Sequence, residues 1–229
     1  MDFARSIEYP LHDKNFVVKW IIGTILSLIP IVNFITYGYM LRVARASKAG
    51  ESAEMPEWDN IGSDFIRGLI AFLGYLLYLL PVIIGSFLFI IPVAVLDAAN
   101  AEILIVLLSL CFILFVTLYS LATLPIFALA AARYAETDDF GGSFLNIGAR
   151  LAEIRRQPLD AVIFTVFVIV IQLLMSFLVS LTFWLCGLGF VFIWIGNIIM
   201  AHFGGQYAAR VDRGPGSSSA YNPVPDNYV

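Results

Sequence analysis

Long apolar stretches alternate with short polar segments along almost the whole chain. The apolar runs cover residues 16–43, 65–96, 103–132, 159–184 and 188–209. About 20 apolar residues in a helix span the roughly 30 Å hydrocarbon core of a bilayer. The pattern therefore predicts an all-α fold, namely a polytopic α-helical integral membrane protein.

The first run differs from the others because Pro30 and Asn33 interrupt it. As one helix, residues 16–43 would be about 42 Å long, more than a single crossing needs. Pro30 removes one backbone hydrogen bond and kinks the helix. Two alternatives stay open: one long kinked span, or a hairpin whose arms of about 14 residues suit a re-entrant segment.

The other four runs form two predicted transmembrane hairpins. The turn at 97–102 carries two acidic residues and no Lys or Arg, whereas Arg67 and Arg133 flank the outer ends. The second turn, at 186–189, is uncharged, and the chain leaves the last run at Arg210 and Arg213. Because Lys and Arg favour the cytoplasmic side, both turns are expected outside and the C-terminus in the cytoplasm.

Three polar segments complete the predicted organisation. Residues 1–15 form an N-terminal polar segment, residues 16–213 the helical membrane domain, and residues 214–229 a flexible tail rich in Gly, Ser and Pro. Within the domain, residues 143–156 predict a cytoplasmic amphipathic helix with arginines beside its apolar positions. Those apolar positions, at spacings of 3, 4 and 3, are Phe144, Ile147, Leu151 and Ile154.

Composition and charge agree with this class. Hydrophobic residues make up 60% of the chain and charged residues 13%, against roughly 25% charged in soluble domains. Of the 13 Lys and Arg residues, only Arg5, Lys14 and Lys19 depend on how the first run is arranged. Lys19 is expected to snorkel to the headgroups, and Asp160 to pair with the nearby arginines of the amphipathic helix.

The two cysteines, Cys111 and Cys186, are expected to be buried free thiols. A bridge between them would require the two side chains to lie at matching depths. The N-terminal segment mixes acidic and basic residues and lacks a small-residue cleavage site, so no cleaved signal peptide is expected.

Several short motifs resemble a family of prokaryotic membrane proteins, the domain of unknown function 4013. The motifs are Gly38-Tyr39, Leu41-Arg42-Val43, Pro56-Glu57-Trp58-Asp59, Gly62, Phe65, Gly68-Leu69 and the segment 201–207. The Pro-Glu-Trp-Asp block is the specific part, and the resemblance spans roughly Phe16 to Arg210. It implies a prokaryotic cytoplasmic membrane, and it transfers no reaction, cofactor or catalytic residue.

Polar groups inside the apolar runs are the candidates for chemistry. The amides are expected to bond between helices or, alternatively, to line a polar path. His202 is a candidate axial ligand for a pigment or haem, although a hydrogen-bonded packing role is favoured. A metal site would need further ligands at i+3 or i+4, and these are missing. The four amides are Asn33, Gln172, Asn197 and Gln206.

Known catalytic motifs are missing, so we expect no enzyme and no cofactor. We expect instead a non-catalytic accessory, scaffold or assembly subunit that binds membrane lipids and other membrane proteins, and no nucleic acid. The alternatives are a small permease or channel, and pigment or haem binding. Contacts with a partner are assigned to cytoplasmic loops and the tail, and the residues named for them are Trp58, Tyr221, Pro223, Pro225 and Tyr228. The alternative for Trp58 is a role as an anchor at the membrane interface.

Overall fold

The computed structural model describes residues 1–50, 54–182 and 188–214, and these residues form helices and turns without a strand. This confirms the all-α fold class. The elements in chain order are α1 (Phe3–Glu8), η1 (Tyr9–Leu11), α2 (Phe16–Leu28), α3 (Phe34–Ala49), α4 (Ile61–Ala98), α5 (Glu102–Thr137), η2 (Gly141–Leu145), α6 (Ile147–Arg156), α7 (Pro158–Thr182) and α8 (Leu188–Arg213).

Four of the described helices are long and apolar enough to cross a membrane. They are α4, α5, α7 and the part of α8 from Gly189 to Arg213. The first apolar run does not form one helix, because the chain breaks between Leu28 and Phe34, around Pro30. At 13 residues, α2 is about 20 Å long and too short to cross the hydrocarbon core alone.

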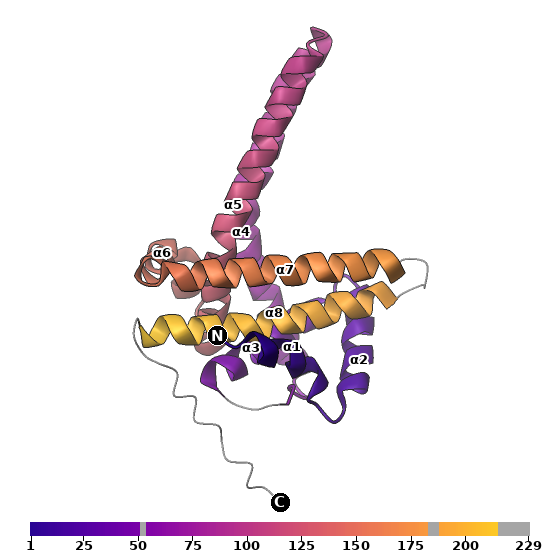
Figure 1. The fold of residues 1–229 in the computed structure, drawn as a ribbon, viewed down its shortest axis with the longest axis vertical. Helices are drawn as coiled ribbons and strands as arrows, with labels where there is room; N and C mark the ends of the chain where they lie inside the picture. Colours follow the sequence, from indigo (N-terminus) through magenta and orange to yellow (C-terminus); the bar gives the residue numbers. More distant parts are fainter. Residues whose placement is uncertain (51–53, 183–187, 215–229) are drawn as a thin grey trace, which may run out of the picture.

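The α4–α5 hairpin projects well beyond the rest of the molecule (Figure 1). Its α4 arm runs continuously through Pro81 and Pro92, so these prolines do not divide it. No residue in the most apolar stretch of either arm is buried by the protein. Cys111 lies on the second arm as a free thiol, and it is exposed rather than buried because this part of α5 has few protein neighbours.

The pair α7 and α8 lies across the axis of the α4–α5 hairpin (Figure 1). Helix α8 occupies the centre of the body, where it packs against α2, α3 and α7. Its side chains Trp194, Ile198 and Phe203 are almost completely buried. The base of the α4–α5 hairpin is buried in the body, at Ala71 of α4 and Ala130 of α5, while its far end is not.

Helices α3 and α4 approach closely at two glycines. A Cβ atom on Gly38 would overlap the backbone of Asp64, and one on Gly68 would overlap the carbonyl oxygen of Phe34. No side chain fits at either position without moving a backbone. Both glycines belong to the motifs that carry the family resemblance. Close packing of α3 against α4 therefore explains why these two motif positions are glycine.

The predicted amphipathic helix is shorter than expected. Helix α6 begins at Ile147, and the preceding residues form the π-helical turn η2. Arg150 is buried, and its guanidinium lies 3.1 Å from Glu153 Oε2, whereas Ile147 and Leu151 are exposed. Of the predicted apolar positions, Ile147 and Leu151 thus point away from the protein, as in a helix lying on a membrane surface, whereas Ile154 and Phe144 pack against the core.

Candidate functional site

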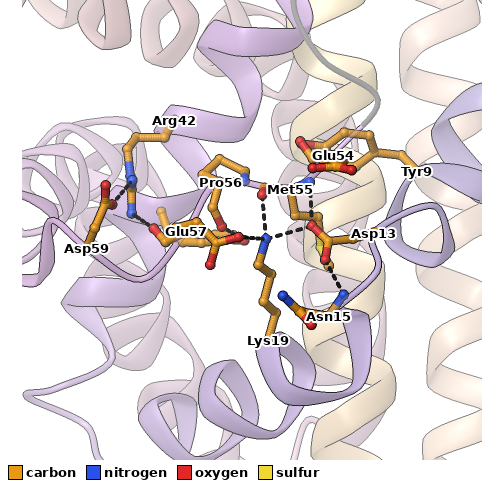
Figure 2. Close-up of polar contacts among 11 residues, drawn as sticks. Tyr9, Asp13, Asn15, Lys19, Arg42, Glu54, Met55, Pro56, Glu57 and Asp59 are labelled. Atoms are coloured by element: carbon orange, nitrogen blue, oxygen red, sulfur yellow. Dashed lines mark hydrogen bonds and ion pairs between the residues drawn. The ribbon is translucent and has the colours of Figure 1, made fainter. Parts of the chain in front are cut away.

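The most polar buried region of the body surrounds the segment between α3 and α4. Lys19 of α2 is 2% exposed, and its Nζ lies 2.6 Å from both Asp13 Oδ2 and Glu57 Oε1. The same nitrogen donates a hydrogen bond of 2.7 Å to the carbonyl oxygen of Met55 (Figure 2). All three ammonium protons therefore have acceptors. The side chain points into the protein, not toward the lipid headgroups as its position in the sequence suggested.

Asp13 is the buried counterpart of this lysine. Besides the Lys19 ammonium, its carboxylate accepts hydrogen bonds from the backbone amides of Asn15, at 2.7 Å, and Met55, at 3.0 Å. Burial by itself would raise the pKa of Asp13, but the hydrogen bonds and the positive charge of Lys19 outweigh it and hold this pKa below its usual range. The carboxylate therefore stays charged at neutral pH.

Arg42 of α3 binds the same segment from the other side. Its guanidinium donates hydrogen bonds to Asp59 Oδ1, at 2.8 Å, to the carbonyl oxygen of Glu57, at 2.8 Å, and to Asp64 Oδ2, at 2.6 Å. The hydrogen bond from Arg42 lowers the pKa of Asp59. Glu57 thus lies between the two cations, as Figure 2 shows. We call Asp13, Lys19, Arg42, Glu57, Asp59 and Asp64 the ion-pair cluster.

Aromatic rings cover the ion-pair cluster on its inner side. Trp58 stacks on Tyr39, with 4.1 Å between ring centroids, and on Trp194, with 5.6 Å. The Tyr39 hydroxyl donates a hydrogen bond of 2.8 Å to the carbonyl oxygen of Pro56. The Pro-Glu-Trp-Asp block is therefore fastened to the body by ring stacking, backbone hydrogen bonds and charges. Its Trp58, predicted as a membrane anchor or a partner contact, packs within the protein's own aromatic cluster.

An open hollow of about 510 Å³ lies beside Lys19, between α2 and the Glu57–Asp59 segment. Lys19 is shared by two carboxylates and Arg42 by two others, so each cation is already neutralised. One oxygen of Asp64, Oδ1, is buried and lacks a hydrogen-bond partner in the described structure. The cluster holds α2, α3 and α4 together, and it offers neither a nucleophile paired with a base nor an unneutralised cation for a substrate.

His202 belongs to a second polar cluster, where α1 docks on α8. Its Nδ1 lies 2.9 Å from Ser6 Oγ, and its ring stacks on Tyr9 with 4.3 Å between centroids. Gln206 accepts a hydrogen bond of 2.6 Å from the backbone amide of Asp2 and donates one of 3.0 Å to Ser6 Oγ. His202 therefore fills a packing role, with one ring nitrogen and one ring face already in contact with the protein.

The predicted polar amides are not gathered along one path. Gln206 joins α8 to α1, as expected for an interhelical bond, and lies beside His202. Asn33 bonds locally with Thr36 at the start of α3. Gln172 is exposed on α7, and Asn197 is half-buried on α8. Among the residues that the structure describes, no group of three or more His, Cys, Asp or Glu side chains is arranged to hold a metal ion.

A third set of charges joins the C-terminal ends of α3, α5 and α8. Lys48 Nζ lies 2.7 Å from Glu136 Oε2 and 2.6 Å from Asp212 Oδ2, and Arg133 reaches the same Asp212 at 3.2 Å. Three helix ends that the sequence assigned to the cytoplasmic side therefore meet in space. The ion pairs that join these ends connect different helices, so the spacing of residues in the sequence does not predict them.

Asp160 pairs with a different arginine from those expected. Its carboxylate lies 3.0 Å from Arg210 Nε, at the end of α8, and the expected partners Arg155 and Arg156 are exposed at the end of α6. The pair links the start of α7 to the end of α8, because these two helices run antiparallel. The prediction of Arg155 or Arg156 as the partner was wrong, because these residues end α6 and Asp160 belongs to the next helix, α7.

Some predicted features lie outside the described residues. These are the turn at 186–187 with Cys186, and the tail residues Tyr221, Pro223, Pro225 and Tyr228.

The signal that sequence reasoning missed is the polar stripe on α8. His202 and Gln206 are four residues apart, so they share one face of a helix, and that face receives the N-terminal segment.

Comparison with known proteins gives one match. A family model described as "Protein of unknown function (DUF4013)" matches residues 22–184, more than half of the chain. This range includes the Pro-Glu-Trp-Asp block and leaves the expected similarity at 201–207 beyond the matched residues. No curated protein and no solved structure gives a significant match. On the family match, the chain is a member of the DUF4013 family of proteins of unknown function.

Proposed function

We propose that this protein is a non-catalytic integral membrane protein that works by association, as an accessory, scaffold or assembly subunit of a larger membrane complex. The observation that carries the proposal is the exposure of the α4–α5 hairpin. Both arms are strongly apolar, yet the protein buries none of their most apolar stretches. A surface of this kind is complete only in contact with lipid or with other membrane helices.

The length of the hairpin supports a role beyond anchoring. Helices α4 and α5 contain 38 and 36 residues, so each is about 55 Å long, well beyond the roughly 30 Å of the hydrocarbon core. The proposed location is the prokaryotic cytoplasmic membrane with a cytoplasmic C-terminus. The meeting of the basic ends of α3, α5 and α8 supports that orientation, because basic helix ends favour the cytoplasm.

Association is favoured over the two other functions. A permease needs polar groups along one path. Asn33 bonds locally at the start of α3, Gln172 is exposed on α7, and His202 is buried beside Ser6. His202 is 2% exposed, so a pigment or haem at its second ring nitrogen would need the side chains packed around it to move. Absorption spectra of the purified protein test the pigment alternative, and a liposome flux assay with His202→Ala tests the permease.

Native purification of three forms tests the association itself. The first variant replaces Leu107, Leu110 and Leu114 with alanine, which trims one exposed face of α5. Its matched control replaces Val166, Val170 and Leu173, an equally exposed face of α7. We expect the α5 variant to lose membrane protein partners that the wild type and the α7 control retain. Retention of every partner by the α5 variant would contradict the hairpin as the contact element.

Deletion of residues 214–229 tests the other assigned contact. If the tail docks on a partner, its removal weakens copurification even though the hairpin is intact. If the tail deletion leaves the partners unchanged and the α5 variant loses them, the hairpin alone carries the association.

A further inference from the structure

A second feature of the body has no part in the ion-pair cluster or in the hairpin face. A pocket of about 410 Å³ lies where the base of the α4–α5 hairpin meets α3, α7 and α8. All four candidate membrane helices contribute to its walls. In Figure 1 this is the region in which α4 and α5 pass α7 and α8. Its volume falls within the roughly 300–1,000 Å³ of ordinary ligand pockets.

Small residues create the space in the floor of the pocket. The floor includes Ala71 of α4, Ala132 of α5 and Gly204 of α8, all of them buried. A Cβ atom on Gly204 would meet only Phe164, at 3.9 Å, which is ordinary van der Waals contact. The neighbouring Gly205, which does not line the pocket, has no such room, because its Cβ would overlap the backbone of Ala44. The pocket therefore leaves room for additional atoms beside Gly204.

The mouth of the pocket is different in character. Tyr37 and Tyr75 line it and are 39% and 43% exposed. The Tyr37 ring stacks on Phe72, and the Tyr75 ring meets Phe127 edge to face. Their hydroxyl groups are the polar side-chain groups of an otherwise apolar lining. The pocket thus presents an apolar interior and a polar rim, which matches a ligand with a long apolar tail and a polar end.

We propose that this pocket binds one acyl chain of a membrane phospholipid. Water does not suit the interior, because a buried water needs two to four polar partners. An empty pocket leaves the wall atoms without dispersion contacts. The surrounding bilayer supplies acyl chains at high concentration, and one chain entering from the hydrocarbon fills the space without leaving an apolar medium. The ester and glycerol groups of the same lipid then meet the hydroxyls of Tyr37 and Tyr75.

Native mass spectrometry of the whole protein, purified in mild detergent and washed free of bulk lipid, tests the proposal. We expect the wild type to keep one phospholipid per chain. Ala128→Phe and Ala131→Phe fill the pocket from α5, and we expect each to lower the bound fraction by about tenfold. Ala122→Phe places the same ring at an exposed position of α5 outside the pocket, and we expect it to leave the lipid in place.

Each other outcome overturns the proposal. A wild-type protein without bound phospholipid contradicts it, whatever the variants do. A free fatty acid in place of a phospholipid identifies a different occupant. Equal phospholipid retention by all four forms assigns the lipid to the outer surface of the helices instead of the pocket. Circular dichroism and gel filtration confirm that the variants used in the comparison are folded.

Discussion

Helix α5 belongs to two regions that differ in almost every physical respect. Near its C-terminal end, Leu129, Ala130 and Tyr134 are buried against neighbouring helices. Near its start, Leu107 and Leu110 are more than half exposed, and α4 is the neighbouring helix. Leucine stands in both regions, 3% exposed at Leu129 and 52% exposed at Leu107. The difference teaches that hydrophobicity alone does not distinguish a residue that folds this protein from one that meets its surroundings.

The body also uses interactions that the hairpin lacks. Close helix contacts at Gly38 and Gly68, the paired charges of Lys19 and Arg42, and a stacked aromatic cluster hold α2, α3, α4 and α8 together. In the outer hairpin the described contacts are largely apolar, for example Phe89 stacked on Phe112 at 4.5 Å. We therefore expect stability to depend on the body, and association on the hairpin.

The largest effect is expected from breaking the ion-pair cluster. Lys19→Met removes the cation shared by Asp13 and Glu57, and leaves the buried Asp13 carboxylate without its charged partner. Losing one member of a buried pair costs about 3–5 kcal/mol. Lys14→Met, at an exposed position five residues earlier, is the control and should change stability little. Denaturation in detergent measures both, and equal stability of the two variants would show that the cluster does not hold the body.

A matched pair on α5 sharpens the comparison within one helix. Leu129 is 3% exposed and Leu107 is 52% exposed. Leu129→Ala should cost about 2–5 kcal/mol through lost packing and a residual cavity. Leu107→Ala removes the same atoms from a surface that the protein does not cover, so the unfolding midpoint should stay near that of the wild type. Similar losses for the two variants would mean that the hairpin contributes to the fold as the body does.

A smaller effect is expected at the α3–α4 contact. Gly68→Ala forces a methyl group against the backbone of Phe34, and overpacking of this kind costs about 1–3 kcal/mol. Gly85→Ala, farther along α4, meets only Phe112 and Phe115 at 3.5 Å, so it should be neutral or slightly stabilising. The melting temperatures of the two variants measure the contrast. A lower melting temperature for Gly85→Ala than for Gly68→Ala would contradict the claim that the tight helix contact lies at Gly68.

The smallest expected effect is a change in melting temperature when the pH is lowered. The pKa of Asp13 is held below its usual range in the folded protein, so its contribution is complete above the ordinary carboxyl value of about 3.9. As the pH falls through the lowered pKa, the carboxylate is protonated and that contribution is lost. Melting temperatures measured from neutral pH downward should therefore fall only below about pH 4. In Lys19→Met the Lys19 charge no longer offsets burial, so the pKa of Asp13 should rise and acidification should lower the melting temperature less than in the wild type, or raise it. Identical profiles would contradict the assigned pairing.

The sequence predicted the helical class and the four long apolar helices, because apolar run length acts locally. It predicted a distortion at Pro30 but left open whether the helix kinks or breaks there. It did not predict that Lys19 and Arg42 share the Pro-Glu-Trp-Asp segment, because both contacts join residues far apart in the chain. The sequence also did not predict that the α4–α5 hairpin is exposed. An apolar helix has the same sequence pattern whether lipid or protein covers it.

For residues whose type suggested a function of their own, the sequence did not predict their neighbours. Trp58 was assigned to the membrane surface or a partner, which stays a prediction, and its half-buried ring stacks on Tyr39 and Trp194. His202 was offered as a possible ligand to a cofactor, with packing favoured, and the contact with Ser6 agrees with the favoured role. In both cases the partner comes from a distant segment, which residue type and spacing do not identify.

Site-specific photocrosslinking in intact cells tests the central claim most directly. A photoreactive amino acid is placed at Leu114 of α5 and, in a separate variant, at Val170 of α7, which are 58% and 55% exposed. The account predicts a discrete adduct with another membrane protein at Leu114 and only lipid adducts at Val170. Lipid adducts alone at both positions would contradict the claim that the exposed hairpin serves association.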